Sequence, residues 1–578
     1  MAERVSWWSR ALVLAGTVVL AVDGSAQRPA GRSVVETVQV NVVNVEVYVT
    51  GADGNPLRGL RREDFELEED GEPVDITNFY ASDAVMAVSA GTLPGEAPVV
   101  PPTAAPAPVP VPDEQVLTVV FFIDALNTPM NGRKVVLDQL QRLIESDLGT
   151  NSRMLVLSFD RSLKQLSPLT TDRRAILEAL GSVGREAPTA SALNSERQFL
   201  LRRLFTQSDR PVGGVNSPCR EWQGGADEGP PEVCSAITAH AEQLLQLNRA
   251  LIRGLGRALD ALSGVAGRKA LVLVSAGIPP RPGEDLLFIS YGPAGPSSTL
   301  TPELDEIAAR ANSGRITFYT VNPRGDQLAS PLDASDELST IATDGALKQT
   351  LITANQMDLG SRQEALTDLA VATGGRTLLA GPGLGNALGQ VEQEFGAYYS
   401  LGFSPDHSGD GTYHDLKVRL RVRGARIRHR EGYLDKTDAQ RLADRAAGAL
   451  LGETRPNGLR VKATTGEPVK KGSKFLVPLT VTVAAADLLL LPSADGTAQE
   501  GRVALIISAT DRGGQISDAH NEQFPIHVPA AVAEAFKRGE TTYSFELLMR
   551  KGTHKVAVIA RDELALTDGS LTFDVTVP

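Results

Sequence analysis

The sequence predicts a multi-domain protein of the α/β plus β class. A central doubly wound α/β domain is expected between a small N-terminal β domain and a C-terminal β sandwich. Three observations predict this. At 578 residues the chain is too long for one ordinary core. Its middle section alternates short apolar runs with amphipathic helical patterns, which is typical of a mainly parallel sheet covered by helices on both faces. Both flanking sections show the period-two alternation of half-buried strands instead.

Composition and charge restrict the possible functions. Apolar residues make up 42% of the chain and charged residues 22%, which is ordinary for a globular protein. The 70 acidic residues outnumber the 57 lysines and arginines, so the formal net charge is -13 at pH 7. Such a charge repels polyphosphates and anionic membranes at long range. We therefore expect no nucleic-acid partner.

The first 26 residues read as a secretory signal peptide. Arg4 and Arg10 precede the apolar stretch 11–21, and the small residues at 24–26 precede Gln27, where the mature chain is expected to begin. Eleven apolar residues are too few to span a bilayer, which needs about 20. After cleavage no stable membrane span is expected, with an uncleaved anchor as the alternative.

Residues 34–82 are expected to form the small N-terminal β domain. Valines at every second position from Val43 to Val49 line one face of a strand, and the Asp-Gly pairs at 53–54 and 70–71 are typical of turns. The segment 83–114 that follows is a Pro/Ala-rich linker with eight prolines between Pro94 and Pro112. Such a segment favours an extended spacer that holds the β domain at a distance, with a proline-motif ligand as the alternative.

Residues 115–435 carry the pattern of the central α/β domain. Four apolar runs are short and nearly continuous, as in strands buried on both faces. They are "VLTVVFFI" (116–123), "RMLVLSF" (153–159), "KALVLVSAG" (269–277) and "RITFYTV" (315–321). Between them leucine and isoleucine recur at three- and four-residue spacing, which indicates helices. Residues 436–457 read as a helical connector, and 458–578 as the C-terminal β sandwich because of their alternating runs.

An insert at 208–236 holds both cysteines of the chain, Cys219 and Cys234. In an exported protein such a pair is most simply a disulfide, and closing a loop of about 15 residues stabilises the fold by about 3 kcal/mol in the chain-entropy model. A cysteine-only metal site would need more ligands than the insert offers. We predict that the two residues are bonded to each other.

In several of its segments, the sequence from about 35 to 435 resembles the secreted bacterial proteins with a von Willebrand factor type A (vWA)-related domain. The matching segments are "LRREDFELEEDG", the strand that ends at Asp124, "PLTTD", "LVLVSAG", "ATGGRTLL" and "YYSLGFSP" with "REGYL". The resemblance implies a vWA-like (Rossmann-type) fold. In many relatives it also implies a metal-dependent adhesion site at the carboxyl end of the sheet.

That site normally uses an Asp-x-Ser-x-Ser loop, a threonine from a second loop and an aspartate from a third. Asp124 matches the first aspartate, Thr128 replaces the second serine, and Thr170 in "PLTTD" matches the threonine. Leu126 and Ala276 stand where a serine and the last aspartate are expected. The resemblance thus implies a metal site that lacks two of its oxygen ligands.

The predicted site is therefore degenerate. Mg²⁺ prefers near-octahedral oxygen coordination, so Asp124, Thr128 and Thr170 alone are expected to bind it weakly at most. Asn127 offers one further oxygen from a different position in the loop. We expect no cofactor and no tight metal, although weak binding of Mg²⁺ or another divalent cation stays open. Asp124 is then expected to accept hydrogen bonds from loop amides at the strand end.

Catalytic motifs are not recognisable. None of the seven histidines forms His-Glu-x-x-His, no Gly-x-Ser-x-Gly elbow occurs, and "GPGLGNALG" lacks the third glycine of a dinucleotide loop. His407 and His414 flank "SGDGTY", which reads as a hairpin turn. Nucleophilic and zinc-dependent hydrolysis are unsupported by these patterns.

The sequence thus predicts an exported, periplasmic or extracellular, non-enzymatic protein with a binding, adhesion or scaffolding role. The partner is expected to be an extracytoplasmic protein or glycan. It should dock where ligands usually bind open α/β sheets, on the loops after the strands, here 124–130, 160–171 and 275–281. The alternatives are a secreted hydrolase with a site not recognisable from sequence and a true metal-dependent adhesin.

Overall fold

The computed structural model describes most of the chain. The described residues are 42–82, 116–145, 152–185, 189–207, 219, 232–293, 295–325, 345–452, 458–511, 516–517 and 519–578. The predicted signal peptide, the predicted linker and most of the predicted insert lie outside them. The described residues form two compact units. The large unit lies within Val42–Leu259 and Ala266–Asp435, and the C-terminal unit takes in Asp260–Val265 and Lys436–Pro578.

The large unit contains a six-stranded sheet in the order β10-β9-β8-β5-β6-β7. All neighbours are parallel except β6 and β7, which are antiparallel. The apolar runs form the inner strands because both faces are covered, and every residue of β8 is buried. The strands are β5 (Leu117–Asp124), β6 (Arg153–Phe159), β7 (Leu163–Gln165), β8 (Arg268–Val274), β9 (Ile316–Asn322) and β10 (Arg376–Leu379).

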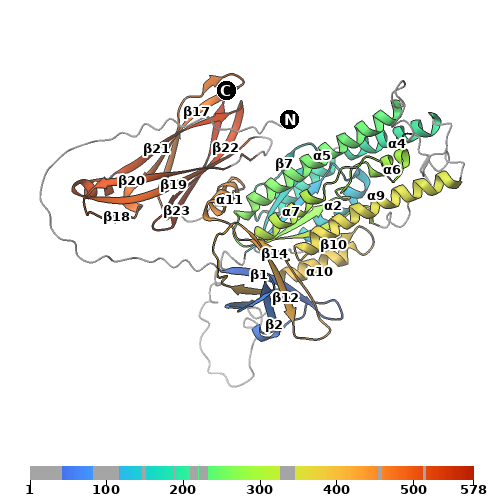
Figure 1. Ribbon diagram of the computed structural model, residues 1–578, viewed down its shortest axis with the longest axis horizontal. Helices are drawn as coiled ribbons and strands as arrows, with labels where there is room; N and C mark the ends of the chain where they lie inside the picture. Colours follow the sequence, from blue (N-terminus) through green and yellow to red (C-terminus); the bar gives the residue numbers. More distant parts are fainter. Residues whose placement is uncertain are drawn as a thin grey trace. The chain divides into compact units, whose positions relative to one another are not determined.

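Helices pack on both faces of this sheet (Figure 1). On one face, alternate side chains of β5 share a core with apolar residues of α2, α3 and α10. On the other face, Phe159 of β6 lies against Gly254 of α5, and the Thr320 hydroxyl of β9 donates to the Leu366 carbonyl of α9. The helices are α2 (Met130–Glu145), α3 (Arg173–Arg185), α4 (Thr189–Gln207), α5 (Glu232–Ser263), α6 (Glu284–Tyr291), α7 (Thr301–Ser313), α9 (Gly345–Ala372) and α10 (Leu384–Gly396).

The disulfide expected from the sequence is present between Cys219 and Cys234. Both cysteines are buried in a small apolar cluster with residues of α4, α5, α6 and α9. The Cys219 amide also donates to the Ser290 carbonyl of α6 at 3.0 Å. The bond therefore anchors Cys219 to the beginning of α5.

Two further sheets in the large unit correct one expectation. Their orders are β13-β1-β11-β4 and β14-β12-β2-β3, so strands from both ends of the unit are neighbours. The expected separate domain at 34–82 is wrong because β1 pairs with β11 and β13, and β2 pairs with β12. The elements are β1 (Val43–Thr50), the 3-10 helix η1 (Arg62–Asp64), β2 (Phe65–Glu69), β3 (Glu72–Val74), β4 (Asn78–Ala81), β11 (Tyr399–Phe403), β12 (Tyr413–Leu420), β13 (Arg426–His429) and β14 (Gly432–Leu434).

Core formation explains why these strands combine. A segment of about 40 residues is too short to bury a core by itself. Apolar residues of β1 and β2 instead share one core with residues of β11, β12 and β14. The aromatic rings of Phe65 and Tyr399 meet there with centroids 5.3 Å apart. The N-terminal strands and the strands after α10 therefore form two sheets that pack around one shared core.

One ion pair and one buried guanidinium connect this β region to other elements of the large unit. Glu46 of β1 accepts hydrogen bonds from the Arg315 guanidinium, which directly precedes β9. The buried Arg430 donates to the carbonyls of Asn312 and Asn44, at 2.5 Å and 2.7 Å. Because these charges are removed from water, each must keep its partner for the fold to be stable.

The C-terminal unit is built from two antiparallel sheets with one shared apolar core. One sheet pairs β17 with β15, β16 and β21, and the other has the order β18-β19-β22-β23 with β20 beside β19. The strands are β15 (Val461–Thr465), β16 (Val469–Lys471), β17 (Lys474–Ala484), β18 (Leu491–Pro492), β19 (Ala498–Thr510), β20 (His520–Pro529), β21 (Glu540–Met549), β22 (Gly552–Asp562) and β23 (Thr567–Val577). Short helices η5 (Ala485–Asp487), η6 (Ala530–Val532) and α12 (Ala533–Lys537) connect them.

The segment expected as a helical connector belongs to this unit. Helix α11 (Asp438–Leu450) begins with a capping box, in which the Thr437 hydroxyl accepts from the Gln440 backbone amide and the Gln440 side-chain oxygen accepts from the Thr437 backbone amide. Its apolar residues Leu442 and Ala446 are buried in a cluster with residues of β19 and β22. The sequence predicted only a connector between domains here. The structure corrects this, because the apolar face of the helix packs on a sheet of the C-terminal unit. Across the described parts of the chain, no helix combines the length and apolar character that crossing a membrane requires.

Candidate functional site

The candidate site lies at the carboxyl edge of the central sheet, where β5 ends at Asp124. The Asp124 side chain is fully buried. Its Oδ2 atom accepts hydrogen bonds from the Ser275 hydroxyl at 2.6 Å and from the Asn127 side-chain amide at 2.9 Å. Its Oδ1 atom accepts from the Asn127 backbone amide at 3.0 Å. Burial raises the pKa of Asp124, and these hydrogen bonds offset part of that effect.

The neighbouring predicted residues also make internal contacts. The Asn127 amide nitrogen donates to the side-chain oxygen of Asn248 on α5 at 3.0 Å. The buried Thr128 hydroxyl accepts from the Ala276 amide at 3.2 Å. Leu126 and Ala276, which stand where the resemblance implies two oxygen ligands, are themselves buried. Asp124, Asn127 and Thr128 are thus brought together, but their polar atoms connect the loops after β5 and β8.

Thr170 is not part of this site. After β6 the chain turns back through β7, which pairs antiparallel with β6, and Thr170 then bridges Met154 at the beginning of β6. Asp124 is level with Phe159 at the opposite end of that strand. Met154 and Phe159 are five positions apart along β6, which corresponds to about 16 Å. The Thr170 hydroxyl instead accepts from the Asp172 amide at 3.0 Å, next to the beginning of α3.

A cleft opens beside the Asp124 loops. Its volume is about 790 Å³. The loop after β5, the loop after β9 and helices α4, α5, α6 and α9 contribute to its wall. Part of the wall is apolar, formed by Leu126, Pro129, Leu193, Leu244, Leu286 and Leu359. The cleft can therefore take a ligand that has an apolar portion.

Three arginines from separate elements also line the cleft. Arg197 of α4 is paired with Asp285 and also donates to the Asn355 side chain. Arg362 of α9 is paired through Nε with both oxygens of Asp358, at 2.9 Å each. Attraction to Arg197 outweighs burial and lowers the pKa of the Asp285 carboxyl. The carboxylates of Asp285 and Asp358 are thus each already paired with an arginine.

The third arginine, Arg324, differs from the other two. It follows β9 and is half-buried in the cleft wall. Its backbone amide donates to the Asn322 side chain, but among the described residues its guanidinium makes no hydrogen bond or ion pair. Burial first, and then repulsion from Arg362, lower the pKa of Arg324 to about 10. A cation in such surroundings favours an incoming anion.

The described residues that line the cleft carry a small positive net charge. Three guanidinium groups stand against the carboxylates of Asp285 and Asp358, which gives 3 − 2 = +1. His240, also in the wall, is kept neutral because burial lowers its pKa more than the nearby Glu196 and Asp285 raise it. One negative charge on a ligand would balance this wall.

Sequence reasoning missed all three arginines. Arg324 had a usable signal, because it closely follows the apolar run 315–321 and so falls at the carboxyl end of a strand. Arg197 and Arg362 lie on helices, and no local pattern separates them from ordinary surface arginines. Only the tertiary structure brings α4 and α9 to the same cleft.

The sequence matches no family model and no curated protein. Among solved structures it is similar to an aerotolerance-related membrane protein from Bacteroides fragilis, at 10% identity over 48% of this chain and 98% of that one, with a TM-score of 0.21. It is also similar to the conserved hypothetical protein BatB from Bacteroides thetaiotaomicron, at 12% identity over 48% and 96%, with a TM-score of 0.20. A third similar structure is the manganese-loaded TRAP protein of Plasmodium vivax, at 10% identity over 56% and 95%, with a TM-score of 0.21.

Proposed function

We propose that this chain is an exported, non-enzymatic binding protein, periplasmic or extracellular, with an adhesion or scaffolding role. The cleft at the carboxyl edge of its vWA-like sheet binds a carboxylate group of an extracytoplasmic protein directly, without a bridging metal ion. The observation that carries this proposal is the Arg324 guanidinium, which lies in the cleft wall and makes no hydrogen bond or ion pair with the described residues.

The charge of the wall supports a carboxylate as the ligand group. A net charge of +1 matches one carboxylate better than a dianionic phosphate, and guanidinium groups bind carboxylates through paired hydrogen bonds. The leucines of the wall suit an apolar side chain next to the acidic group. A peptide supplies both features, whereas a glycan is rich in hydroxyl groups. We therefore favour a protein partner over a glycan.

The contacts of Asp124 support binding without a metal ion. Its oxygens are already used by Ser275 and Asn127, and the neighbouring ligand positions hold Leu126 and Ala276. A divalent cation would have to displace these hydrogen bonds and would find few replacement oxygens. The Ser275 hydroxyl donates to Asp124 and accepts from the Gly277 amide, so it is engaged as a structural group. These contacts also favour a binding role over hydrolysis.

Selection from a random peptide display library on the full-length chain tests this proposal. We expect enriched peptides to share an acidic residue or a free carboxyl terminus next to an apolar residue. Arg324→Gln should weaken their binding about tenfold or more, because hydrogen bonds to charged groups contribute roughly 1.5–3 kcal/mol. Arg423→Gln, at an exposed position outside the cleft, is the matched control and should bind normally. Peptides without a shared acidic group, or equal binding by Arg324→Gln, would contradict the proposal.

A further inference from the structure

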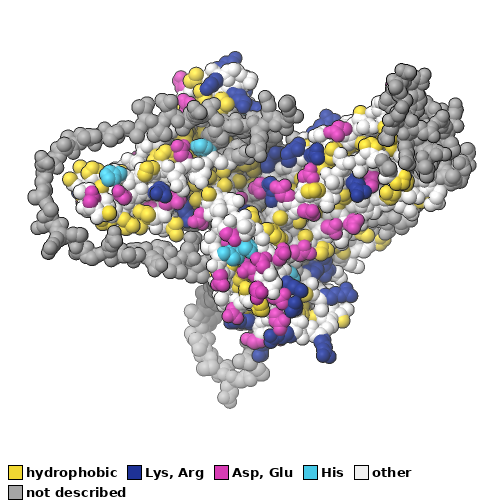
Figure 2. All heavy atoms as spheres, in the orientation of Figure 1, with side chains coloured by type: hydrophobic (Ala, Val, Ile, Leu, Met, Phe, Trp, Pro, Cys, Tyr) yellow, Lys and Arg dark blue, Asp and Glu magenta, His cyan; other side chains and the backbone are white. Residues whose placement is uncertain are grey.

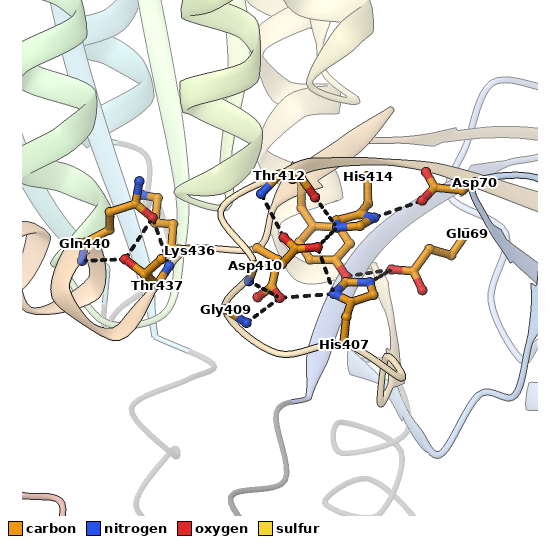
Figure 3. A network of polar contacts seen from close by, with 12 residues as sticks. Glu69, Asp70, His407, Gly409, Asp410, Thr412, His414, Lys436, Thr437 and Gln440 are labelled. Carbon is orange, nitrogen blue, oxygen red and sulfur yellow. Dashed lines mark hydrogen bonds and ion pairs between the residues drawn. The ribbon is translucent and has the colours of Figure 1, made fainter.

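A group of histidine and acidic side chains lies in the β region of the large unit, away from the cleft. His407 and Asp410 belong to the loop between β11 and β12 (Figure 3). Asp435 directly follows β14. On the face drawn in Figure 2, histidine side chains lie among acidic ones. These three residues are close enough for their ligand atoms to share one metal ion.

The spacing of the three ligand atoms fits a small divalent cation. The Nδ1 atom of His407 is 3.0 Å from Oδ2 of Asp435 and 3.9 Å from Oδ2 of Asp410. Ligands about 2.1 Å from a tetrahedral zinc ion are about 3.4 Å apart, which lies between these two values. Asp435 is buried, with 1% of its surface exposed, and its Oδ2 atom also accepts from the Gly409 amide. The main carboxylate of the group is thus fixed in place.

The surroundings of the His407 ring support the same conclusion. Each ring nitrogen faces a carboxylate, with Nδ1 near Asp435 and Nε2 3.4 Å from Oε1 of Glu69. The buried Nε2 atom has no hydrogen-bond partner among the described residues. A neutral imidazole donates from only one nitrogen, so one carboxylate always faces a lone pair. A metal ion on Nδ1 removes this conflict, because Nε2–H can then donate a hydrogen bond to Glu69. In metal sites, a carboxylate outside the ligand set commonly accepts such a bond from the second nitrogen of a histidine ligand.

His414 is better placed to orient a ligand than to bind the same ion. Its ring is stacked on that of His407, with centroids 3.9 Å apart and an interplanar angle of 15°. One ion cannot lie in the planes of two stacked rings. The Nε2 atom of His414 is instead 3.1 Å from Oδ2 of Asp410, and its Nδ1 atom is 2.8 Å from Asp70. We therefore treat His414 as a positioning residue for Asp410.

We propose that His407, Asp410 and Asp435 form a binding site for one divalent transition-metal ion such as Zn²⁺. The imidazole ligand favours this class of metal over Mg²⁺. The charge of the group is suitable, because within the described residues Glu69, Asp70 and Asp410 form ion pairs with the two histidines and with no lysine or arginine. The ion would hold the loop after β11 to the end of β14. This site is independent of the cleft and of the function proposed for it.

Calorimetric titration of the full-length, tag-free chain with ZnCl₂ after chelator treatment tests the site. We expect one saturable site with a micromolar or lower dissociation constant, unaffected by millimolar Mg²⁺. His407→Gln and Asp410→Asn should each weaken zinc binding about tenfold or more, since even outer-shell changes cost 10- to 100-fold in metal affinity. Co²⁺ in place of Zn²⁺ should give visible absorption bands that both variants lose. His527→Gln, a 65% exposed histidine of the C-terminal unit, is the control and should leave binding unchanged.

The outcomes that overturn this inference are distinct. Absence of saturable zinc binding, or zinc binding that survives both variants, would show that the group is only a network of hydrogen bonds and ion pairs. Equal competition by Mg²⁺ would contradict the transition-metal assignment. Circular dichroism in the presence of chelator checks that each variant is folded. Asp410 is partly exposed, so its conservative variant keeps the test valid if His407→Gln does not fold.

Discussion

Replacing Glu46 with glutamine is expected to destabilise the large unit by about 3 kcal/mol or more, because it removes the buried carboxylate charge that pairs with the Arg315 guanidinium. Glu46 is 7% exposed and accepts from Arg315, while the buried Arg430 lies close enough to lower its pKa. Hydrogen exchange measured by mass spectrometry on peptides of β1 and β11 should report the loss separately from the C-terminal unit. Glu72→Gln, at an exposed position of β3, is the matched control and should have little effect.

The stability lost in Glu46→Gln should also depend on pH. Burial alone would raise the pKa of Glu46, but Arg315 and Arg430 lower it below its ordinary value. A carboxyl group with a lowered pKa in the folded protein contributes stability above its unfolded pKa and loses it as the pH falls through the folded pKa. The difference between wild type and Glu46→Gln should therefore shrink in acid. Equal stability of the two proteins at neutral pH would show that β1 is not held by this ion pair.

Asp124→Ala is expected to cost about 3 kcal/mol for a different reason. The substitution removes the acceptor of the buried Ser275 hydroxyl and of the Asn127 amide, and each unsatisfied buried group costs roughly 1–3 kcal/mol. Hydrogen exchange on peptides of β5 and β8 measures the loss. Asp138→Ala is the matched control, because it makes the same substitution at an exposed position of α2 and should have little effect.

The pH dependence of this second effect has the opposite sign. Burial raises the pKa of Asp124 in the folded protein. A carboxyl group with a raised pKa contributes stability below its unfolded pKa and loses it as the pH rises through the folded pKa. The difference between wild type and Asp124→Ala should therefore grow from about pH 7 to about pH 4. A difference that shrinks in this range would mean that the carboxylate form is the one the fold favours.

The strands of the central sheet could be predicted from the sequence because their signal is local. The apolar run 116–123 corresponds to β5, and the run 153–159 coincides with β6. The pairing of β1 with β11 could not be predicted in the same way. Alternating valines show that one face of β1 is buried, but they do not show which distant strand completes the core. The proline-rich segment between them suggested separation where the chain instead returns to the same sheet.

The candidate site shows the same limit. Asp124 was predicted correctly as a hydrogen-bond acceptor at a strand end, because its position after an apolar run fixes where it lies. Thr170 was misplaced because the resemblance fixed its loop but not the course of the chain, which runs back along β6. Arg324 was missed although it follows β9, since an arginine after a strand is common. Its role depends on the lack of an acceptor for its guanidinium among the described residues and on the nearby Arg362, and neither can be seen before the chain is folded.

Direct binding of a carboxylate without a metal ion is tested most directly by calorimetry with the most enriched peptide from the display selection. The dissociation constant should be the same in EDTA and in millimolar MgCl₂, and it should rise about tenfold or more in Arg324→Gln at constant ionic strength. Binding that disappears in EDTA, returns with Mg²⁺ and is unchanged by Arg324→Gln would contradict the account.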